Sequence, residues 1–140
     1  MTYYQSDKLI ERIDWKELMP LERCAGGHDE HMKGLLKDVT LIAHWNEGDY
    51  QGEVATCVML NDTKEIVIYS DYYGSCSGCD AWDDASDAEI IQMCRQLACD
   101  AYVFKNIEDC KEFLTNVDKT DFEWYTVGEF LLKAINEASQ

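Results

Sequence analysis

The chain has 140 residues, of which 28 are Asp or Glu and 12 are Lys or Arg, giving a formal net charge of −16 at pH 7. A surface this acidic repels the phosphates of nucleic acids and of anionic membranes, so we expect no direct binding to either, and a basic partner is favoured. Hydrophobic residues make up 46% of the chain, enough for one core, and no linker or repeat interrupts it. We therefore expect a single domain, 1–140.

The start of the chain and its cysteines indicate a reducing compartment. Residues 1–8 are polar and charged, unlike a secretory signal, and no apolar run approaches the ~20 residues that cross a bilayer. Seven cysteines without an export signal are typical of reduced thiols. We therefore expect a cytoplasmic protein.

Two helices are predicted before the first strand. An amphipathic helix should run from the N-cap Ser6 to Pro20, because apolar residues recur there at helical spacing. These apolar residues are Leu9, Ile10, Ile13 and Leu18. After a break at Gly26–Gly27, a second short helix is predicted over Asp29–Lys37.

Three strands are predicted next. The ranges Val39–Trp45, Glu53–Leu60 and Glu65–Tyr72 are rich in Val, Ile, Thr and Tyr. Connections of hairpin length join them, so they should form an antiparallel meander.

Capping signals position the remaining helices. Ser86 and Glu89 form a capping box, and Thr120 and Glu123 form another before the last helix. A short strand, Ala101–Phe104, and a helix capped by Asn106 lie between them. The predicted buried stripes of the three helices are Ile90, Ile91, Cys94, Leu97 and Ala98; then Ile107, Cys110, Leu114 and Val117; then Phe130, Leu131, Ala134 and Ile135.

This succession of elements defines the predicted fold class. The order α-β-β-β-α-β-α-α indicates an α+β fold. We expect an antiparallel sheet of three to four strands, packed by helices against one face.

The segment Tyr73–Asp80 is the most informative stretch, because it carries a Cys-x-x-Cys on a glycine-rich turn. Small residues let the backbone turn tightly and bring both sulfurs to one side. Such a knuckle supplies two of the four ligands of a tetrahedral structural zinc, and a second cysteine with a histidine would complete the site. The candidate ligands are Cys76, Cys79, Cys24 and either His28 or His31.

Two other interpretations of this turn stay open. A thiol-redox site would use Cys76 as the attacking thiolate and Cys79 as its resolving partner. The acids that follow, Asp80, Asp83 and Asp84, would raise the pKa of a nearby thiol and suppress the thiolate. A purely structural turn would pack both sulfurs as small apolar groups. The remaining cysteines, Cys57, Cys94, Cys99 and Cys110, lie in strand or helix patterns and are predicted core residues.

Acidic and aromatic residues together predict a partner-binding surface. Five acids occur between Asp80 and Glu89, more than a helix N-terminus needs, because the dipole effect fades within the first turn. Tyrosine and tryptophan are common interface anchors. A solvated acidic coat that only confers solubility is the alternative. The predicted partner-binding residues are Asp80, Trp82, Asp83, Asp84, Asp87, Glu89, Tyr50, Tyr72 and Tyr73.

No catalytic residues are predicted. The three histidines, His28, His31 and His44, are not joined to a nucleophile motif, and no phosphate-binding glycine loop occurs. His44, beside Trp45 in a strand pattern, is interpreted as a packing or surface residue. We therefore expect a binding protein rather than an enzyme.

The segment Tyr-Gly-Ser-Cys-Ser-Gly-Cys-Asp over 73–80, followed by Ala81 and Trp82, resembles a segment of small uncharacterised proteins of bacteriophage type. The likeness extends from the loop Trp45–Gly52 through Phe104, less than half of the chain. It implies a phage-encoded accessory protein made in a bacterial cytosol, and it carries over no catalytic residues.

The function predicted from these features is that of an acidic phage-type accessory protein. It would bind and inhibit a basic, nucleic-acid-binding host protein, such as a defence nuclease. Its carboxylates would take the positions of phosphates, which give duplex DNA one charge per about 1.7 Å of axis. The alternative is a structural zinc-binding domain that acts as an interaction module, and a thiol-redox protein is third. Zinc is the candidate cofactor.

Overall fold

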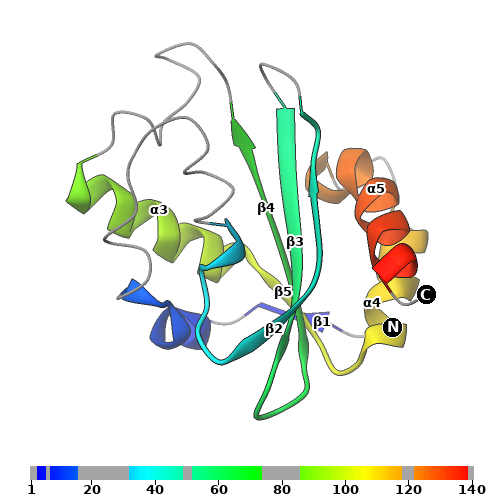
Figure 1. Cartoon of the computed structure of the whole chain (residues 1–140), viewed down its shortest axis with the longest axis horizontal. Coiled ribbons are helices and arrows are strands. Elements are labelled where there is room, and N and C mark those ends of the chain that lie inside the picture. The colour runs from blue at the N-terminus through cyan, green and yellow to red at the C-terminus, as the bar shows by residue number, and fades with distance from the viewer. Residues whose placement is uncertain are drawn as a thin grey trace.

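A five-stranded antiparallel sheet forms the centre of the protein (Figure 1). The computed structural model describes residues 3–5, 7–15, 32–48, 52–73, 86–117 and 122–138. The strands, in the spatial order β1-β5-β4-β3-β2, are β1 (Tyr3–Tyr4), β2 (Val39–Asn46), β3 (Gly52–Leu60), β4 (Ile66–Tyr73) and β5 (Tyr102–Phe104). The predicted α+β class and the β2-β3-β4 meander are confirmed, and the short β1 adds an edge strand beside β5.

Helices cover both faces of this sheet. The 3-10 helix η1 (Asp7–Arg12) and helix α3 (Asp87–Asp100) lie on one face, whereas α4 (Ile107–Thr115) and α5 (Phe122–Ala138) lie on the other (Figure 1). The expectation of helices against one face is therefore wrong. Within the described part of the chain, no helix combines the length and the apolar character that a membrane span requires.

The side-chain alternation of β3 explains why both faces are covered. Val54 and Val58 are buried against η1 and α3, whereas Ala55 and Cys57 are buried against α4 and α5. A sheet with one solvated face alternates apolar and polar residues, but here successive residues on both faces are apolar. Two cores result, one on each side of the sheet.

The N-terminal segment differs from the predicted amphipathic α-helix. It forms the short 3-10 helix η1, and Ile13 then pairs with Leu36 in an isolated antiparallel bridge. The backbone continues this pairing, since the N–H of Asp14 donates to the carbonyl of Leu35 at 2.8 Å and the N–H of Lys37 donates to that of Arg12 at 2.9 Å. These bonds compete with the helical ones. Leu18 and Pro20 lie outside the described residues.

The same pairing shortens the second predicted helix. Within Asp29–Lys37, only Met32 and Lys33 are helical among the described residues, and Leu36 is already bridged to Ile13. The apolar pattern of the first predicted helix nevertheless identified core residues, because Leu9 and Ile13 are buried and Ile10 is partly buried against the same core. Long-range backbone pairing thus replaced local helical bonds without changing which side chains enter the core.

The caps of α3 and α4 are confirmed. The N–H of Glu89 donates to the Ser86 hydroxyl at 3.2 Å and the N–H of Ser86 donates to the Glu89 carboxylate at 3.1 Å, which completes the capping box. Asn106 accepts from the N–H of Asp109 at 2.9 Å and caps α4. Thr120, predicted to cap the last helix, lies outside the described residues.

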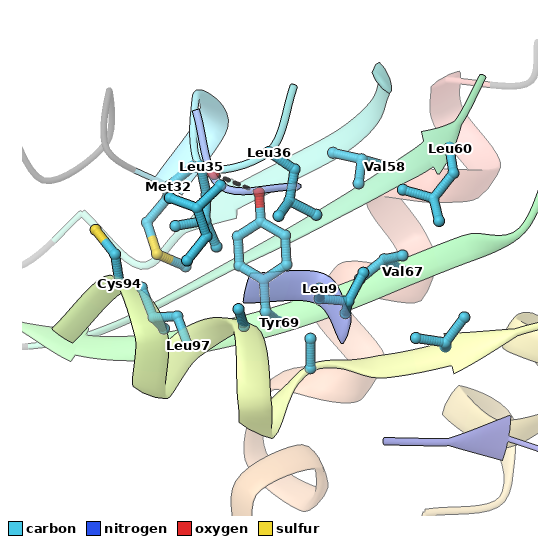
Figure 2. Packing of buried hydrophobic residues seen from close by; sticks show 14 of the residues in the cluster. Leu9, Met32, Leu35, Leu36, Val58, Leu60, Val67, Tyr69, Cys94 and Leu97 are labelled. Carbon is cyan, nitrogen blue, oxygen red and sulfur yellow. Dashed lines mark hydrogen bonds between the residues drawn. The ribbon is translucent and has the colours of Figure 1, made fainter. Parts of the chain in front are cut away.

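A buried tyrosine ties the segment of the second predicted helix to the sheet. Figure 2 shows Tyr69 projecting from β4 among Leu9, Leu35 and Leu36, with its hydroxyl directed at Met32. The hydroxyl donates to the Met32 carbonyl, and only 1% of the Tyr69 surface is exposed. Burial raises the pKa of Tyr69 well above its ordinary value, so the hydroxyl stays protonated and able to donate.

Candidate functional site

The predicted zinc ligands are not tested by the structure. Cys24, His28, Cys76 and Cys79, together with His31, lie outside the described residues. Over the described ranges, no group of three or more His, Cys, Asp or Glu side chains is arranged to hold a metal ion. The zinc site therefore stays a prediction from the sequence.

Four of the predicted partner-binding residues can be placed at least in part. Tyr72 and Tyr73 end β4, Asp87 begins α3, and Glu89 is exposed. The strand register sets Tyr73 opposite Gly52 and Tyr72 opposite Glu53. The two tyrosines thus belong to the end of the sheet where β3 begins. The others, Tyr50, Asp80, Trp82, Asp83 and Asp84, lie outside the described residues.

Glu89 has a structural role in addition to its predicted one. Hydrogen bonds from the backbone N–H of Ser86, and then from its hydroxyl, lower the pKa of the Glu89 carboxyl. Its charge therefore favours the first turn of α3. An exposed carboxylate that is held in place by a cap can still meet a partner.

A concave site in the described chain lies between α5 and the end of the sheet where β2 stops and β3 begins. We call it the α5 hollow; its volume is about 550 Å³. Figure 1 shows α5 running alongside β2 at this end. The hollow is lined by Trp45, Glu47, Glu53, Thr126, Val127 and Phe130. Among these lining residues there are two carboxylates and no lysine or arginine.

A stacked aromatic pair forms one wall of the α5 hollow. The rings of Trp45 on β2 and Phe130 on α5 are nearly parallel, with centroids 4.8 Å apart and an interplanar angle of 5°. Phe130 is 47% exposed, so its predicted place in the buried stripe of the last helix is wrong. Buried residues recur instead as Trp124, Val127, Leu131 and Ile135. Phe130 flanks this stripe beside Thr126, one turn earlier on α5.

Two glutamates form the other wall. Glu53 on β3 accepts a hydrogen bond from the Thr126 hydroxyl at 3.1 Å. The carboxylate of Glu47 accepts from the backbone N–H of Glu53 at 3.2 Å, and the N–H of Glu47 donates to the Glu53 carbonyl at 3.0 Å. The backbone of β3 and the side chain of Thr126 therefore hold the two carboxylates next to each other.

The pKa of Glu53 is affected by the nearby charge of Glu47. Burial raises the pKa of its carboxyl above the ordinary value, the bond from Thr126 opposes that shift, and the charge of Glu47 adds to it. Burial and the charge of Glu47 both destabilise the ionised carboxylate of Glu53. A cation in the α5 hollow would counter both, whereas an anion would increase them.

The described cysteines behave as core residues rather than reactive thiols. Cys57, Cys94 and Cys110 are buried, as predicted, and Cys99 is half-buried; all four are free thiols. A hydrogen bond with Cys110, together with burial, raises the pKa of Cys57, and burial raises that of Cys94 to about 12. Protonated, enclosed thiols are poor nucleophiles.

His44 takes part in packing across the sheet. Its Nδ1 lies 2.9 Å from the hydroxyl of Thr56, which is fully buried on the neighbouring strand. The contact gives a buried hydroxyl a hydrogen-bond partner. This agrees with the interpretation of His44 as a packing residue.

The chain stands apart from the known proteins with which it was compared. No family model, no curated protein and no solved structure matches it. The site therefore has to be interpreted from its own residues.

Sequence reasoning missed the α5 hollow, although part of its signal was visible. Trp45, Glu47 and Glu53 bracket one predicted loop, so their closeness followed from a hairpin. The contribution of α5 could not be predicted, because it depends on which face of the sheet the helix covers. Because Phe130 was predicted to be buried, its stacking on Trp45 at the surface was not predicted.

Proposed function

We propose that this chain is an acidic binding protein that occupies the basic surface of a nucleic-acid-binding protein and inhibits it by charge mimicry. The observation that carries the proposal is the net charge of −16 on 140 residues. Carboxylates set against a Lys/Arg groove would replace the phosphates that normally fill it. The affinity of such a complex depends strongly on the salt concentration.

The charges on the α4 and α5 side of the molecule support this proposal. Described acidic side chains outnumber basic ones there, including at the adjoining strand ends that form the α5 hollow. The acids are Glu47, Glu53, Glu108, Asp109, Glu112, Glu129 and Glu137, and the bases are Lys105, Lys111 and Lys133. The acidic excess of the whole sequence is therefore also present on this described side of the molecule.

The biological setting belongs to the same proposal. The resemblance of residues 73–80 to phage-type proteins supports an accessory protein that acts in the bacterial cytoplasm. A host defence nuclease is a fitting target, because it presents a basic groove to nucleic acid. An inhibitor of this kind needs no catalytic residues.

Competition with DNA tests charge mimicry. Proteins captured from a bacterial lysate on the immobilised chain would each be tested for binding to duplex DNA in the presence and absence of this protein. We expect the captured partners to bind DNA, and we expect DNA and this protein to exclude each other. A partner that holds both at once would contradict mimicry. So would a complex of equal affinity at low salt and at about 0.5 M salt.

The Cys-x-x-Cys segment favours a second candidate, a structural zinc-binding domain that acts as an interaction module. Native mass spectrometry of protein purified without added metal would measure bound zinc directly. The metal should be lost in acid and absent from a Cys76→Ser variant, while Cys99→Ser should retain it as the matched control. Because metal binding is coupled to folding, removing zinc should also lower the melting temperature. A metal-free protein of normal stability would rule out this candidate.

A further inference from the structure

We propose that the α5 hollow is the subsite that receives an arginine side chain of the partner protein. This inference rests on the proposed function, because it names the partner group that the acidic surface takes. It goes beyond net charge by assigning a particular place and a particular side chain.

The size and openness of the hollow suit a side chain inserted from outside. Its volume of about 550 Å³ lies within the usual range of ligand pockets, roughly 300–1,000 Å³. Glu47 and Phe130 are exposed at its margin, and Val127 is buried within it. A side chain can therefore enter along the exposed residues and bring its stem against the apolar ones.

The two walls match the two recognition modes of a guanidinium group. Its edge carries N–H donors that pair with carboxylates, and its flat face stacks on aromatic rings. The α5 hollow offers Glu47 and Glu53 for the first mode and the Trp45–Phe130 stack for the second. A lysine ammonium would use the carboxylates as a point charge but would gain less from the planar ring. The lining therefore favours arginine.

The positions of the polar groups are set before a partner arrives. Thr126 holds one oxygen of Glu53, and the β3 backbone holds one oxygen of Glu47. A carboxylate offers about four lone-pair sites, so each can accept further bonds from a guanidinium. Because the carboxylates are already fixed, less side-chain entropy is lost when the arginine binds.

Charge complementarity gives a further reason for a cationic occupant. Glu53 is half-buried, and Glu47 adds a like charge beside it. An entering guanidinium would pair with both carboxylates and reduce their mutual repulsion. This supports the assignment made from geometry and disfavours an anionic occupant.

The test measures binding of a short arginine-rich peptide and of a lysine-rich peptide of equal length and charge by titration calorimetry. Glu53→Gln keeps the size of the side chain and an oxygen that can accept from Thr126. We expect it to weaken the arginine peptide about tenfold or more. Glu137→Gln, which removes an exposed charge farther along α5, is the matched control and should change affinity by less than about twofold.

A second pair of variants tests the aromatic wall. Phe130→Ala should reduce the preference for arginine over lysine, whereas Tyr125→Ala removes an aromatic ring of similar exposure, 46%, outside the hollow and should leave that preference unchanged. Circular dichroism and thermal melting would verify that every variant is folded. Backbone chemical shifts should move first at the residues that line the α5 hollow.

The outcomes separate this inference from the proposed function. If the wild-type protein binds neither peptide at low salt, the proposed function fails. If it binds both and Glu53→Gln and Glu137→Gln weaken them equally, the acidic surface acts diffusely and only the arginine subsite is wrong. Equal affinities for both peptides in the wild type would overturn the choice of arginine. Self-association that Phe130→Ala abolishes would assign the hollow to a second copy of the chain.

Discussion

Both faces of the sheet carry a core of apolar residues, but the edges of the two cores differ. On the η1 and α3 face, Tyr69 reaches across the core and donates its buried hydroxyl to Met32. On the α4 and α5 face, the core ends in a hollow where Phe130 is 47% exposed and Glu53 is half-buried. The first arrangement is one that stability alone favours. The second leaves apolar and charged groups at a partly desolvated site, which is typical of a binding surface.

The largest effect is expected from a cavity in the core on the α4 and α5 side of the sheet. Trp124 on α5 is fully buried beside Tyr102, with ring centroids 6.0 Å apart. Trp124→Ala should lower the free energy of unfolding by about 3–5 kcal/mol, because it removes a large side chain and leaves a cavity. Urea denaturation would measure this. The neighbouring Tyr125→Ala should cost less than about 1 kcal/mol, since Tyr125 is 46% exposed. Similar costs for the two variants would contradict the assigned orientation of α5.

The opposite face should respond most sharply to the loss of one hydroxyl. Tyr69→Phe keeps the ring but leaves the buried carbonyl of Met32 without its donor. A buried acceptor that loses its partner costs about 1–3 kcal/mol. Hydrogen exchange should also speed up over residues 32–37, because this bond ties that segment to β4. Unchanged exchange there would show that apolar packing alone holds the segment.

A smaller and matched pair of effects is expected at the helix caps on the two faces. Ser86→Ala at α3 and Asn106→Ala at α4 each remove one side-chain acceptor from an N-terminal N–H group. Each should cost about 1 kcal/mol in chemical denaturation. Ser86→Ala should also remove the hydroxyl's bond to Glu89 while keeping the bond from the backbone N–H, so the pKa of Glu89 should rise only part of the way toward its ordinary value. Titration followed by NMR would measure that rise.

Local signals in the sequence predicted the elements better than their arrangement. The strand ranges followed from alternation and β-branched residues, and the starts of α3 and α4 followed from Ser86 and Asn106. Each of these signals acts within a few residues. The replacement of the first helix by η1 was not predictable in this way, because the backbone of Ile13 pairs with Leu36, far along the chain.

The candidate site was harder to predict, for a related reason. Val54, Ala55, Cys57 and Val58 give β3 apolar residues on both faces, and such a run is compatible with one core or with two. Only the second solution brings α5 against β2 and sets Phe130 beside Trp45. The acids at 80–89 were predicted to bind a partner because they are close together in the sequence. Glu47 and Glu53 were not predicted to bind a partner, although the hairpin brings them together.

The smallest effect is expected from Glu53→Gln, which tests whether the α5 hollow costs the free protein stability. Burial and the charge of Glu47 raise the folded-state pKa of Glu53 above its ordinary value of 4.5, so the folded protein binds this proton more tightly than the unfolded chain does. Stability contributed by the protonated carboxyl is therefore complete below pH 4.5 and is lost as pH rises through the raised folded pKa. Glu53→Gln avoids that loss. It should be more stable than the wild type at neutral pH by less than about 1 kcal/mol, because solvent screens a half-buried group.

The control for this prediction must remove a charge of the same sign from elsewhere in the chain. Loss of any carboxylate relieves some repulsion in a chain of net charge −16, and Glu137→Gln measures that general effect. The additional gain of Glu53→Gln should appear as pH rises from about 4 to 7 and should vanish when a saturating arginine-rich peptide is present. A gain that persists with the peptide bound would mean that no cation reaches Glu53. A gain that disappears would show that the ionised carboxylate costs stability in the free protein and is compensated in the complex.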